Sequence, residues 1–528
     1  MTKIKEFVKK NHLIAYLITM FVLFVIGYCV KWYHHPQVAA SLGARAGDLY
    51  EYFNIIFVVL MLGVSVMFFL IVKKVSIEKL YLAGSIFTGI LFLMIVPPMA
   101  SADENNHIYK CYDFSSCLMG KEMPDDKYSH WLRKCDAETE LDRNISAKNY
   151  LYVKDTFFEK PNDTEMVLTH ISDLTYDNDA IIYYFPAVIG ITIGRLCNLS
   201  TAAVYTLGRI FMLMAYVLLT YIALKKIPAF KTGIALVMMM PSTMARVASV
   251  SQDGMLLAYM FVFMAYVVYY IRNREIIKIK DAVIMAVTGV LMTVGKGGAY
   301  IPFLLLLFLI PKENFGKRIK YGVVVGASIA LSFGAYCLWN LSLFTDIAGS
   351  AGGAENSLAW TEEEGYTIKH ILTNPVRSLK VFVNSFITFS GTRYSELIGS
   401  GYGWLQIYTS EVWVVMYTII LAFTTFTTAS AEDEEYCFDK KQKIMSSIIC
   451  ICSSLFVIVS MWIFWTPLSS DNVLGVQGRY FIPIAALLLM VLKNRFIQVK
   501  TDITRYLITA AIIVHVGTFF NIWSKIII

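Results

Sequence analysis

Residues 80–98 read LYLAGSIFTGILFLMIVPP, and residues 99–107 continue as MASADENNH. The first stretch is a continuous apolar run, about as long as a helix needs to cross the hydrocarbon core of a membrane. The second places two adjacent carboxylates, Asp103 and Glu104, at the mouth of that run. Because charged groups at the edge of hydrocarbon are costly unless solvated or paired, the stretch predicts a membrane helix that leads into a functional site.

The rest of the chain repeats this apolar pattern. Of its 528 residues, 57% are hydrophobic and only 16% are charged, whereas a soluble domain has about a quarter of its residues charged. The apolar runs are continuous, while the strands of a membrane β-barrel would be shorter and alternating. The composition therefore predicts an all-α polytopic membrane protein. Its spans, about thirteen by this criterion, are expected near 12–31, 53–72, 80–98, 209–224, 232–248, 255–271, 281–295, 299–311, 321–340, 411–429, 444–465, 480–493 and 505–523.

Basic residues between the spans predict the orientation, because short cytoplasmic loops are enriched in lysine and arginine. The N-terminus is basic, which places it in the cytoplasm, and its apolar run is too long for a cleaved signal peptide. All later clusters fall on the same side, provided that residues 181–197 do not cross the membrane. These clusters are Lys3, Lys5, Lys9 and Lys10; Lys73, Lys74 and Lys79; Lys225, Lys226 and Lys231; Arg272, Arg274, Lys278 and Lys280; Lys312, Lys317, Arg318 and Lys320; Lys440, Lys441 and Lys443; and Lys493, Arg495 and Lys500.

Two long hydrophilic loops, 99–208 and 341–410, then lie outside the cytoplasm and are expected to carry surface helices. The basic residues lie in short loops between the spans, where they indicate the membrane orientation. The net charge of +7 therefore gives no reason to expect nucleic-acid binding. The nine cysteines contain no CxxC pair. Cys111, Cys117 and Cys135 share one loop and allow at most one disulfide, and their spacing is not that of a zinc site.

The acid pair has two interpretations. In the first, Asp103 or Glu104 is a general base that takes a proton from an attacking hydroxyl, while the other carboxylate orients the site or binds a cation. In the second, both residues cap a surface helix after Pro97 and Pro98. His107 lies on the same face if the segment is helical, and it either orients a carboxylate or is simply solvated.

A few basic residues lie on the predicted outer side and are exceptions to the enrichment of lysine and arginine in cytoplasmic loops. Lys296 in a glycine-rich turn and Arg479 before a span are candidate ligands for a lipid-linked phosphate, and Arg393 is a weaker candidate of the same kind. The alternative is interfacial anchoring. Asp253 lies at another outer turn, where it either helps to hold the site together, pairs with Arg246 or caps a helix.

Taken in order, several short motifs resemble one bacterial membrane-protein family. They are Pro97-Pro98 with Asp103-Glu104 and His107; Tyr184-Phe185-Pro186; Leu207-Gly208-Arg209; Pro241 with Ser249, Ser251 and Asp253; Lys296 with Tyr300; Gly401-Tyr402-Gly403-Trp404-Leu405; and Gln477-Gly478-Arg479-Tyr480-Phe481. This order resembles the family catalogued as domain of unknown function 2142 and, more loosely, the GT-C superfamily of membrane glycosyltransferases. The resemblance covers roughly residues 80–523, so the two spans within residues 1–79 look like an addition to a core of residues 80–528.

Two positions depart from the family pattern. The acidic motif normally has flanking prolines, which Ala102 and Asn105 replace here. Gln406 stands where the family usually has an aspartate after the Gly-Trp-Leu motif, so no carboxylate role can be assigned there.

The resemblance implies an inverting glycosyltransferase of a bacterial cytoplasmic membrane. Its donor would be a polyprenyl-phosphate-linked sugar and its acceptor a lipid-linked or polymeric cell-envelope glycan, with Asp103 or Glu104 as base on the extracytoplasmic face. The implied substrate-binding residues are His107, Asp253, Lys296, Tyr300, Arg393, Trp404, Arg479 and Tyr480. Relatives differ in whether they use a divalent cation such as Mg²⁺ or Mn²⁺, and the metal ligands here are unknown.

Two other functions remain open at the level of sequence. A transporter or flippase for a lipid-linked glycan would be expected to show ionisable residues in mid-span and repeated halves, and neither pattern is evident. A non-catalytic scaffold for an envelope-synthesis complex is the second alternative.

Overall fold

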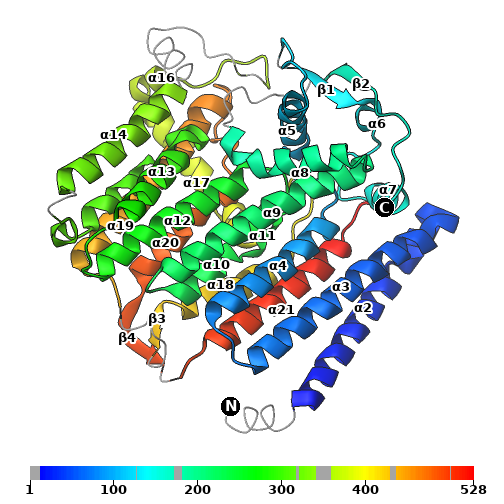
Figure 1. The fold of residues 1–528 in the computed structure, drawn as a ribbon, viewed down its shortest axis with the longest axis horizontal. Helices are drawn as coiled ribbons and strands as arrows, with labels where there is room; N and C mark the ends of the chain where they lie inside the picture. Colours follow the sequence, from blue (N-terminus) through cyan, green and yellow to red (C-terminus); the bar gives the residue numbers. More distant parts are fainter. Residues whose placement is uncertain are drawn as a thin grey trace.

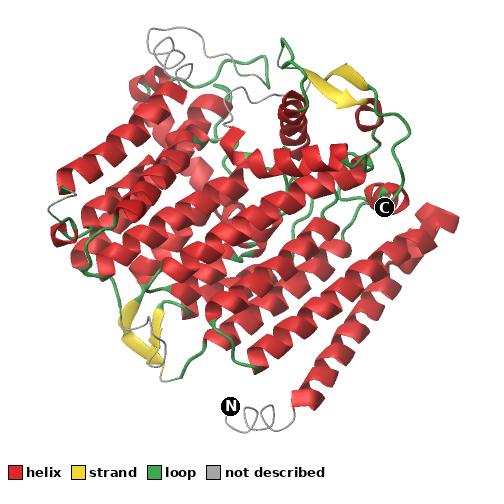
Figure 2. Ribbon diagram, in the orientation of Figure 1, coloured by secondary structure: helices red, strands yellow, loops and turns green. Residues whose placement is uncertain are grey.

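The computed structural model describes residues 12–126, 128–171, 181–316, 320–339, 358, 360–428, 436–499 and 501–528. The described chain is mostly helical, as predicted, with two small sheets at opposite ends of the fold (Figure 1 and Figure 2). These sheets were not predicted. Strand β1 (Ser129–Arg133) pairs antiparallel with β2 (Met166–His170), and β3 (Phe426–Thr428) pairs parallel with β4 (Asn494–Val499).

An N-terminal pair of long helices lies along one edge of the bundle (Figure 1). Helix α2 (His12–Leu42) leads through η1 (Gly43–Arg45) into α3 (Ala46–Val72). Most large apolar side chains of α2 are exposed, as expected for a helix that faces lipid. Helix α2 continues well beyond the predicted end at residue 31, because Pro36 is accommodated inside it.

The central layer follows in chain order. It consists of α4 (Ile77–Ile95), α9 (Thr201–Lys226), α10 (Lys231–Met238), α11 (Pro241–Val247), α12 (Gln252–Arg272), α13 (Ile279–Val294), η3 (Lys296–Gly298), η4 (Ile301–Leu309), η5 (Lys312–Asn314) and α14 (Tyr321–Trp339). Helix α12 is enclosed almost completely by the others. Glycines bring these helices close together: a Cβ on Gly89 of α4 would lie 2.6 Å from the Leu213 side chain of α9.

The C-terminal helices complete the bundle. They are α18 (Glu411–Phe423), α19 (Lys440–Trp465), η6 (Gly478–Phe481), α20 (Ile482–Leu492) and α21 (Thr504–Trp523). Among the described residues, seven helical segments are long and apolar enough to cross a membrane. They are His12–Val72, Ile77–Ile95, Thr201–Lys226, Gln252–Arg272, Tyr321–Trp339, Lys440–Trp465 and Thr504–Trp523. This supports the predicted multi-pass membrane protein.

The two long loops contain further helices. The first holds α5 (Glu104–Leu118), α6 (Lys134–Ala137), α7 (Ala147–Thr156), η2 (Ile181–Tyr183) and α8 (Phe185–Leu196), and the second holds α16 (Ile368–Thr373) and α17 (Pro375–Ile398). Helix α9 begins at Thr201, earlier than the predicted span at 209, because the Ser200 side chain caps it by accepting a hydrogen bond from the Ala203 amide.

Helix α8 stays beside α5 along its whole length. Tyr184, just before α8, contacts His107 in the first turns of α5, and Arg195 at the other end of α8 donates to Ser115 near the end of α5. A Cβ on Gly190 would lie 2.6 Å from the Leu207 carbonyl oxygen, so α8 also packs backbone to backbone against α9. The chain therefore enters α9 from the side of the fold that holds α5.

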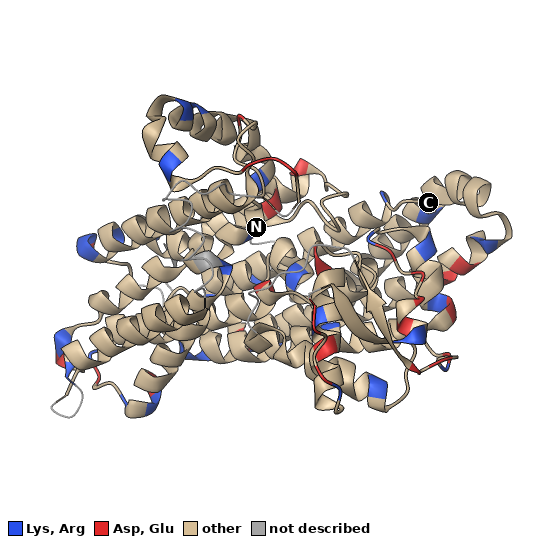
Figure 3. Ribbon diagram, turned by 90° about the horizontal axis from the view of Figure 1, so that it is seen from above, with Lys and Arg blue, Asp and Glu red and all other residues tan. Residues whose placement is uncertain are grey.

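Basic turns converge at the opposite end of the bundle. Lys231 Nζ lies 2.7 Å from Glu78 Oε1, and Lys443 donates to the Lys493 carbonyl at 2.8 Å. Figure 3 shows charged residues mainly at helix ends and in connecting loops, while the long helices are largely uncharged. Lys3, Lys5, Lys9, Lys10, Lys317, Arg318 and Lys500 lie outside the described residues.

Candidate functional site

Asp103 occupies a tight turn between the end of α4 and the start of α5. Its backbone has a φ of +64°, in the left-handed region that non-glycine residues rarely adopt. Asp103 is the residue before the first turn of α5, yet its side chain makes no capping hydrogen bond. The capping interpretation therefore does not describe this carboxylate, which is free to face away from the helix.

Arg479 of η6 joins two carboxylates from distant parts of the chain. Its Nη2 lies 3.2 Å from Asp103 Oδ2, and its Nε lies 3.2 Å from Asp253 Oδ2. Asp253 stands in the first turn of α12, where Ser251 provides the cap by accepting from the Asp253 amide. The Asp253 carboxylate is thus available for ion pairing.

A second cation reaches Asp253 from the opposite side. Lys296 Nζ lies 2.9 Å from Asp253 Oδ1 and 4.7 Å from the centre of the Tyr480 ring. The buried hydroxyl of Tyr300 donates to the Tyr480 carbonyl at 2.9 Å, which fixes the segment that carries Arg479. We call Asp103, Asp253, Lys296 and Arg479 the ion cluster. Four segments that are far apart in sequence meet in it, and all four residues were named from the sequence as candidate site residues.

Neighbouring side chains lower the pKa of the Asp103 carboxyl. Burial raises the pKa of this carboxyl, but electrostatic interactions with Arg479, His107, Lys296 and Arg246 outweigh that effect and leave the pKa below its ordinary value. The Asp103 side chain retains 22% exposure, whereas that of Asp253 retains 9%. Asp103 is therefore an ionised carboxylate that a second molecule can approach.

Glu104 has a different environment although it is the next residue. Its side chain is fully buried, its Oε1 lies 3.2 Å from Arg209 Nε, and the same oxygen accepts from the Val250 amide at 2.8 Å. Arg209 is also fully buried and donates to the carbonyls of Ala248 and Leu93. Glu104 thus joins α5, α9 and the start of α12, and it has no exposed atom with which to meet a substrate.

His107 follows one turn into α5, as the spacing predicted. Its Nδ1 lies 2.8 Å from the Tyr184 hydroxyl, and the two rings pack with centroids 5.3 Å apart. The histidine is buried. It therefore connects α5 to the start of α8 while it contributes to the electrostatic field at Asp103.

A polar cavity adjoins the ion cluster and shares Arg479 with it. The polar lining of the cavity includes Arg246, Glu396, Tyr402 and Gln477. The Tyr402 hydroxyl and Gln477 Oε1 are buried without a hydrogen-bond partner among the described residues. Buried polar atoms are normally paired, so these two are suited to a polar ligand.

Two predicted site residues point elsewhere. Arg393 on α17 donates to the Val473 carbonyl at 3.0 Å, and its guanidinium lies 4.7 Å from the centre of the Phe389 ring. The Trp404 ring is covered by the guanidinium of Arg143 at 4.8 Å. Neither side chain joins the ion cluster through a contact in the described part of the chain.

The donor atoms around the ion cluster do not fit a divalent metal ion. Asp103 and Asp253 share Arg479, and Asp253 also pairs with Lys296, so an added cation would meet fixed positive charge. Within the described ranges, no group of three or more histidine, cysteine, aspartate or glutamate side chains is placed to hold a metal ion. All nine cysteines are free, so Cys111, Cys117 and Cys135 form no disulfide.

Two charged residues that line the cavity, Glu396 and Arg246, were not among the predicted site residues. Glu396 accepts from the Gly478 amide at 2.9 Å and thereby holds η6 against α17. Arg246, considered only as a partner of Asp253, instead donates to the Ser101 hydroxyl at 3.4 Å. The available signal for Glu396 was its position just before the glycine-rich stretch that begins at Gly399.

A family model described as "Predicted membrane protein (DUF2142)" matches residues 86–488. No curated protein and no solved structure matches the chain. The matched range includes every residue of the ion cluster and of the adjoining cavity.

Proposed function

Because the chain belongs to the DUF2142 family of membrane proteins, whose description specifies no reaction, we propose its function from its own ion cluster. We propose that it is a membrane glycosyltransferase that moves a sugar from a polyprenyl-phosphate carrier to a cell-envelope glycan or lipid-linked acceptor. The observation that carries this proposal is a partly exposed, ionised Asp103 set among cations beside a polar cavity.

The proposed topology has thirteen spans in a bacterial cytoplasmic membrane. The shorter segments α10–α11, α13, η4, α18 and α20 would cross in addition to the long helices. The N-terminus and the basic turns would face the cytoplasm, and the ion cluster would face the opposite side. Nucleotide sugars are cytoplasmic, so a donor on this side would be lipid-linked.

The chemistry required is removal of a proton and stabilisation of a leaving phosphate. An acceptor hydroxyl would transfer its proton to the Asp103 carboxylate as its oxygen attacks the anomeric carbon. The bond from that carbon to the phosphate oxygen breaks, and the electron pair leaves with the phosphate. Attack from the face opposite the leaving group inverts the anomeric configuration.

The cations near Asp103 suit the leaving phosphate. Arg479 and Arg246 both line the polar cavity, and guanidinium groups bind phosphate oxygens through paired hydrogen bonds. Lys296 shares the Asp253 carboxylate with Arg479, so Arg479 is not the sole counter-charge of Asp253. Glu104 takes no part in the proposed chemistry, because it is buried against Arg209.

The test is analysis of cell-envelope glycans from a deletion strain complemented with wild-type protein or with Asp103→Asn. We expect one sugar to be missing in the deletion strain, restored by the wild type and still missing with Asp103→Asn at equal protein abundance. Asp163→Asn is the matched control, because Asp163 is an exposed carboxylate in the same long loop whose side chain pairs with surface Lys134 and accepts from the Glu165 amide. A glycan restored by Asp103→Asn would overturn the proposal.

Proteoliposomes separate this proposal from a flippase and from a scaffold. With radiolabelled polyprenyl-phosphate hexoses and extracted envelope glycan supplied on the side of the ion cluster, a transferase moves label to the glycan. Movement of labelled lipid between leaflets without transfer would indicate a flippase. Normal glycan in cells that carry Asp103→Asn or Arg479→Gln would favour a scaffold.

A further inference from the structure

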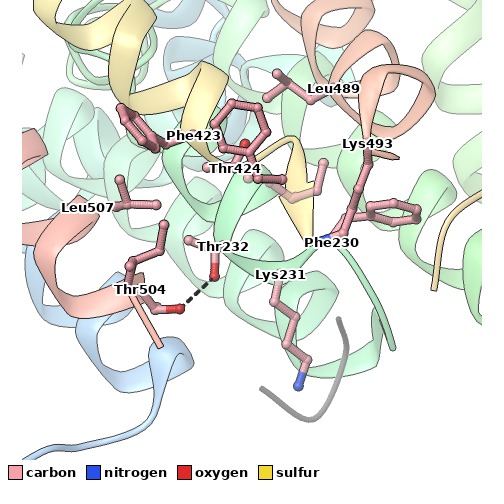
Figure 4. Close-up of a pocket in the computed structure, with 13 residues that line it drawn as sticks. Phe230, Lys231, Thr232, Phe423, Thr424, Leu489, Lys493, Thr504 and Leu507 are labelled. Carbon is pink, nitrogen blue, oxygen red and sulfur yellow. Dashed lines mark hydrogen bonds between the residues drawn. The ribbon is translucent and has the colours of Figure 1, made fainter. Parts of the chain in front are cut away.

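A second pocket lies at the basic end of the bundle, away from the ion cluster. Figure 4 shows it between the start of α10, the end of α18, the end of α20 and the start of α21. Its lining combines threonine hydroxyls and two lysines with apolar side chains such as Phe423 and Leu507, a mixture suited to a ligand with a charged and an apolar part.

The N-terminus of α10 faces this pocket without a side-chain cap. The residue before the helix, Phe230, has a φ of +64° and provides no capping hydrogen bond. Lys231, Thr232 and Gly233, the first three helical residues, all line the pocket. The free amides of a first helical turn and the helix dipole together favour an anion.

Lys493 provides an independent indication of an anionic ligand. This lysine is 6% exposed and lines the pocket, and its ammonium lies 5.9 Å from the centre of the Phe230 ring (Figure 4). No carboxylate pairs with Lys493 within the described residues, whereas Lys231 pairs with Glu78 at 2.7 Å. A buried ammonium needs a counter-charge, because burial without one is costly.

We propose that this pocket binds the phosphate group of an anionic membrane phospholipid. The phosphate would lie between the Lys493 ammonium and the amides of the first turn of α10, with the hydroxyls of Thr232 and Thr504 as further donors. These two hydroxyls are 3.2 Å apart at the edge of the pocket. Phe423 and Leu507 would contact the start of the acyl chains, at the depth where basic pockets between membrane helices meet headgroups.

This site is separate from the proposed glycosyl transfer, since none of its lining residues belongs to the ion cluster or to the polar cavity. The test uses the purified full chain in dodecyl maltoside with added phosphatidylglycerol, with phosphatidylcholine of the same acyl chains, or with inorganic phosphate. Retained lipid is counted by native mass spectrometry, and the melting temperature is followed for each addition.

We expect phosphatidylglycerol to be retained and to raise the melting temperature, while phosphatidylcholine has a smaller effect. Lys493→Met keeps the length of the side chain and should weaken phosphatidylglycerol binding by about fivefold, the usual effect of one basic residue near an anionic surface. Lys441→Met, in the exposed first turn of α19 at the same end, should bind as the wild type does.

Thr232→Val provides a second test that leaves every charge in place, and it should weaken binding less than Lys493→Met does. Equal retention of phosphatidylglycerol by wild type, Lys493→Met and Thr232→Val would overturn the proposal. Equal stabilisation by inorganic phosphate alone would overturn the lipid assignment and indicate a free phosphate. Loss of transfer activity in Asp103→Asn would leave this result unchanged.

Discussion

Asp103 and Glu104 are neighbours in sequence but belong to two different regions of the molecule. Asp103 lies in the ion cluster, where it is partly exposed and shares Arg479 with Asp253. Glu104 lies in the helix-packing core, fully buried against Arg209. The left-handed backbone at Asp103 separates the two side chains. Helix α5 begins at Glu104, and the Asp103 side chain before it is directed away from the Glu104 side chain. Similar carboxylates thus have different environments: Asp103 is accessible from outside the protein, and Glu104 holds helices together.

The largest expected effect comes from removing the carboxylate of Asp103, the proposed base. Asp103→Asn should lower the rate of sugar transfer by about 10²–10⁴-fold, the usual contribution of a positioned general base. Thermal stability in detergent should change little, because this carboxylate is partly exposed. Initial rates and melting curves of the same preparations test both statements. A large loss of stability with a normal rate per folded molecule would reverse the assigned roles.

Removing the buried carboxylate should have the complementary effect. Glu104→Gln leaves the Arg209 charge buried without its counter-ion, which should cost about 3–5 kcal/mol of stability. We expect low abundance and a lower melting temperature, but a near-normal rate from the fraction that remains folded. The double variant Glu104→Leu, Arg209→Met removes both charges and should recover much of the loss, because apolar replacement of a whole buried pair is often neutral.

The pH dependence of the rate tests the role of Arg479. In the wild type, the surrounding side chains keep the pKa of Asp103 below its ordinary value. Because a base must be deprotonated to act, transfer should persist until the pH falls to this lowered pKa. Arg479→Gln removes the first-ranked positive charge acting on Asp103, so the pKa should rise and the acid limb of the rate profile should move to higher pH. An acid limb in the same place would indicate that another group titrates.

The broad architecture was predictable from the sequence. Apolar run lengths and the positions of basic turns predicted a multi-pass helical bundle, and several of the predicted spans coincide with long apolar helices. Helix boundaries were predicted wrongly where a helix continued through a residue that usually ends one, as at Pro36 of α2. Helix α17 was predicted as part of a loop, although Pro375 in its first turn is a typical helix-start signal.

The candidate site was predicted only in part. Lys296 and Arg479 were identified because outer-side cations break the inside bias, and the structure brings both to Asp253. The difference between Asp103 and Glu104 was not predictable, because it depends on one backbone angle and on a partner 105 positions further along, Arg209. Trp404 was included by motif and Arg393 as a further cation on the predicted outer side, yet neither orientation follows from a linear pattern.

Replacement of Arg393 should have the smallest effect on the transfer rate, and it tests whether residues outside the ion cluster contribute to that rate. It is close in sequence to Glu396, which lines the polar cavity, but its own guanidinium bonds the Val473 carbonyl. Arg393→Met should lose that one charge-assisted hydrogen bond, at a cost of about 1.5–3 kcal/mol of stability. The rate per folded molecule should stay within about threefold, because no transition-state contact is removed.

The transfer rate of Arg393→Met should be compared with that of Lys296→Met, which removes a cation from the ion cluster itself. If charge near the membrane surface acted only at long range, both variants would slow transfer to a similar extent, because each removes one positive charge. If the ion cluster acts through direct contacts, Lys296→Met should slow transfer and Arg393→Met should not, since Lys296 lies 2.9 Å from Asp253. Rates measured at low and high salt decide between them, because screening weakens only the long-range contribution.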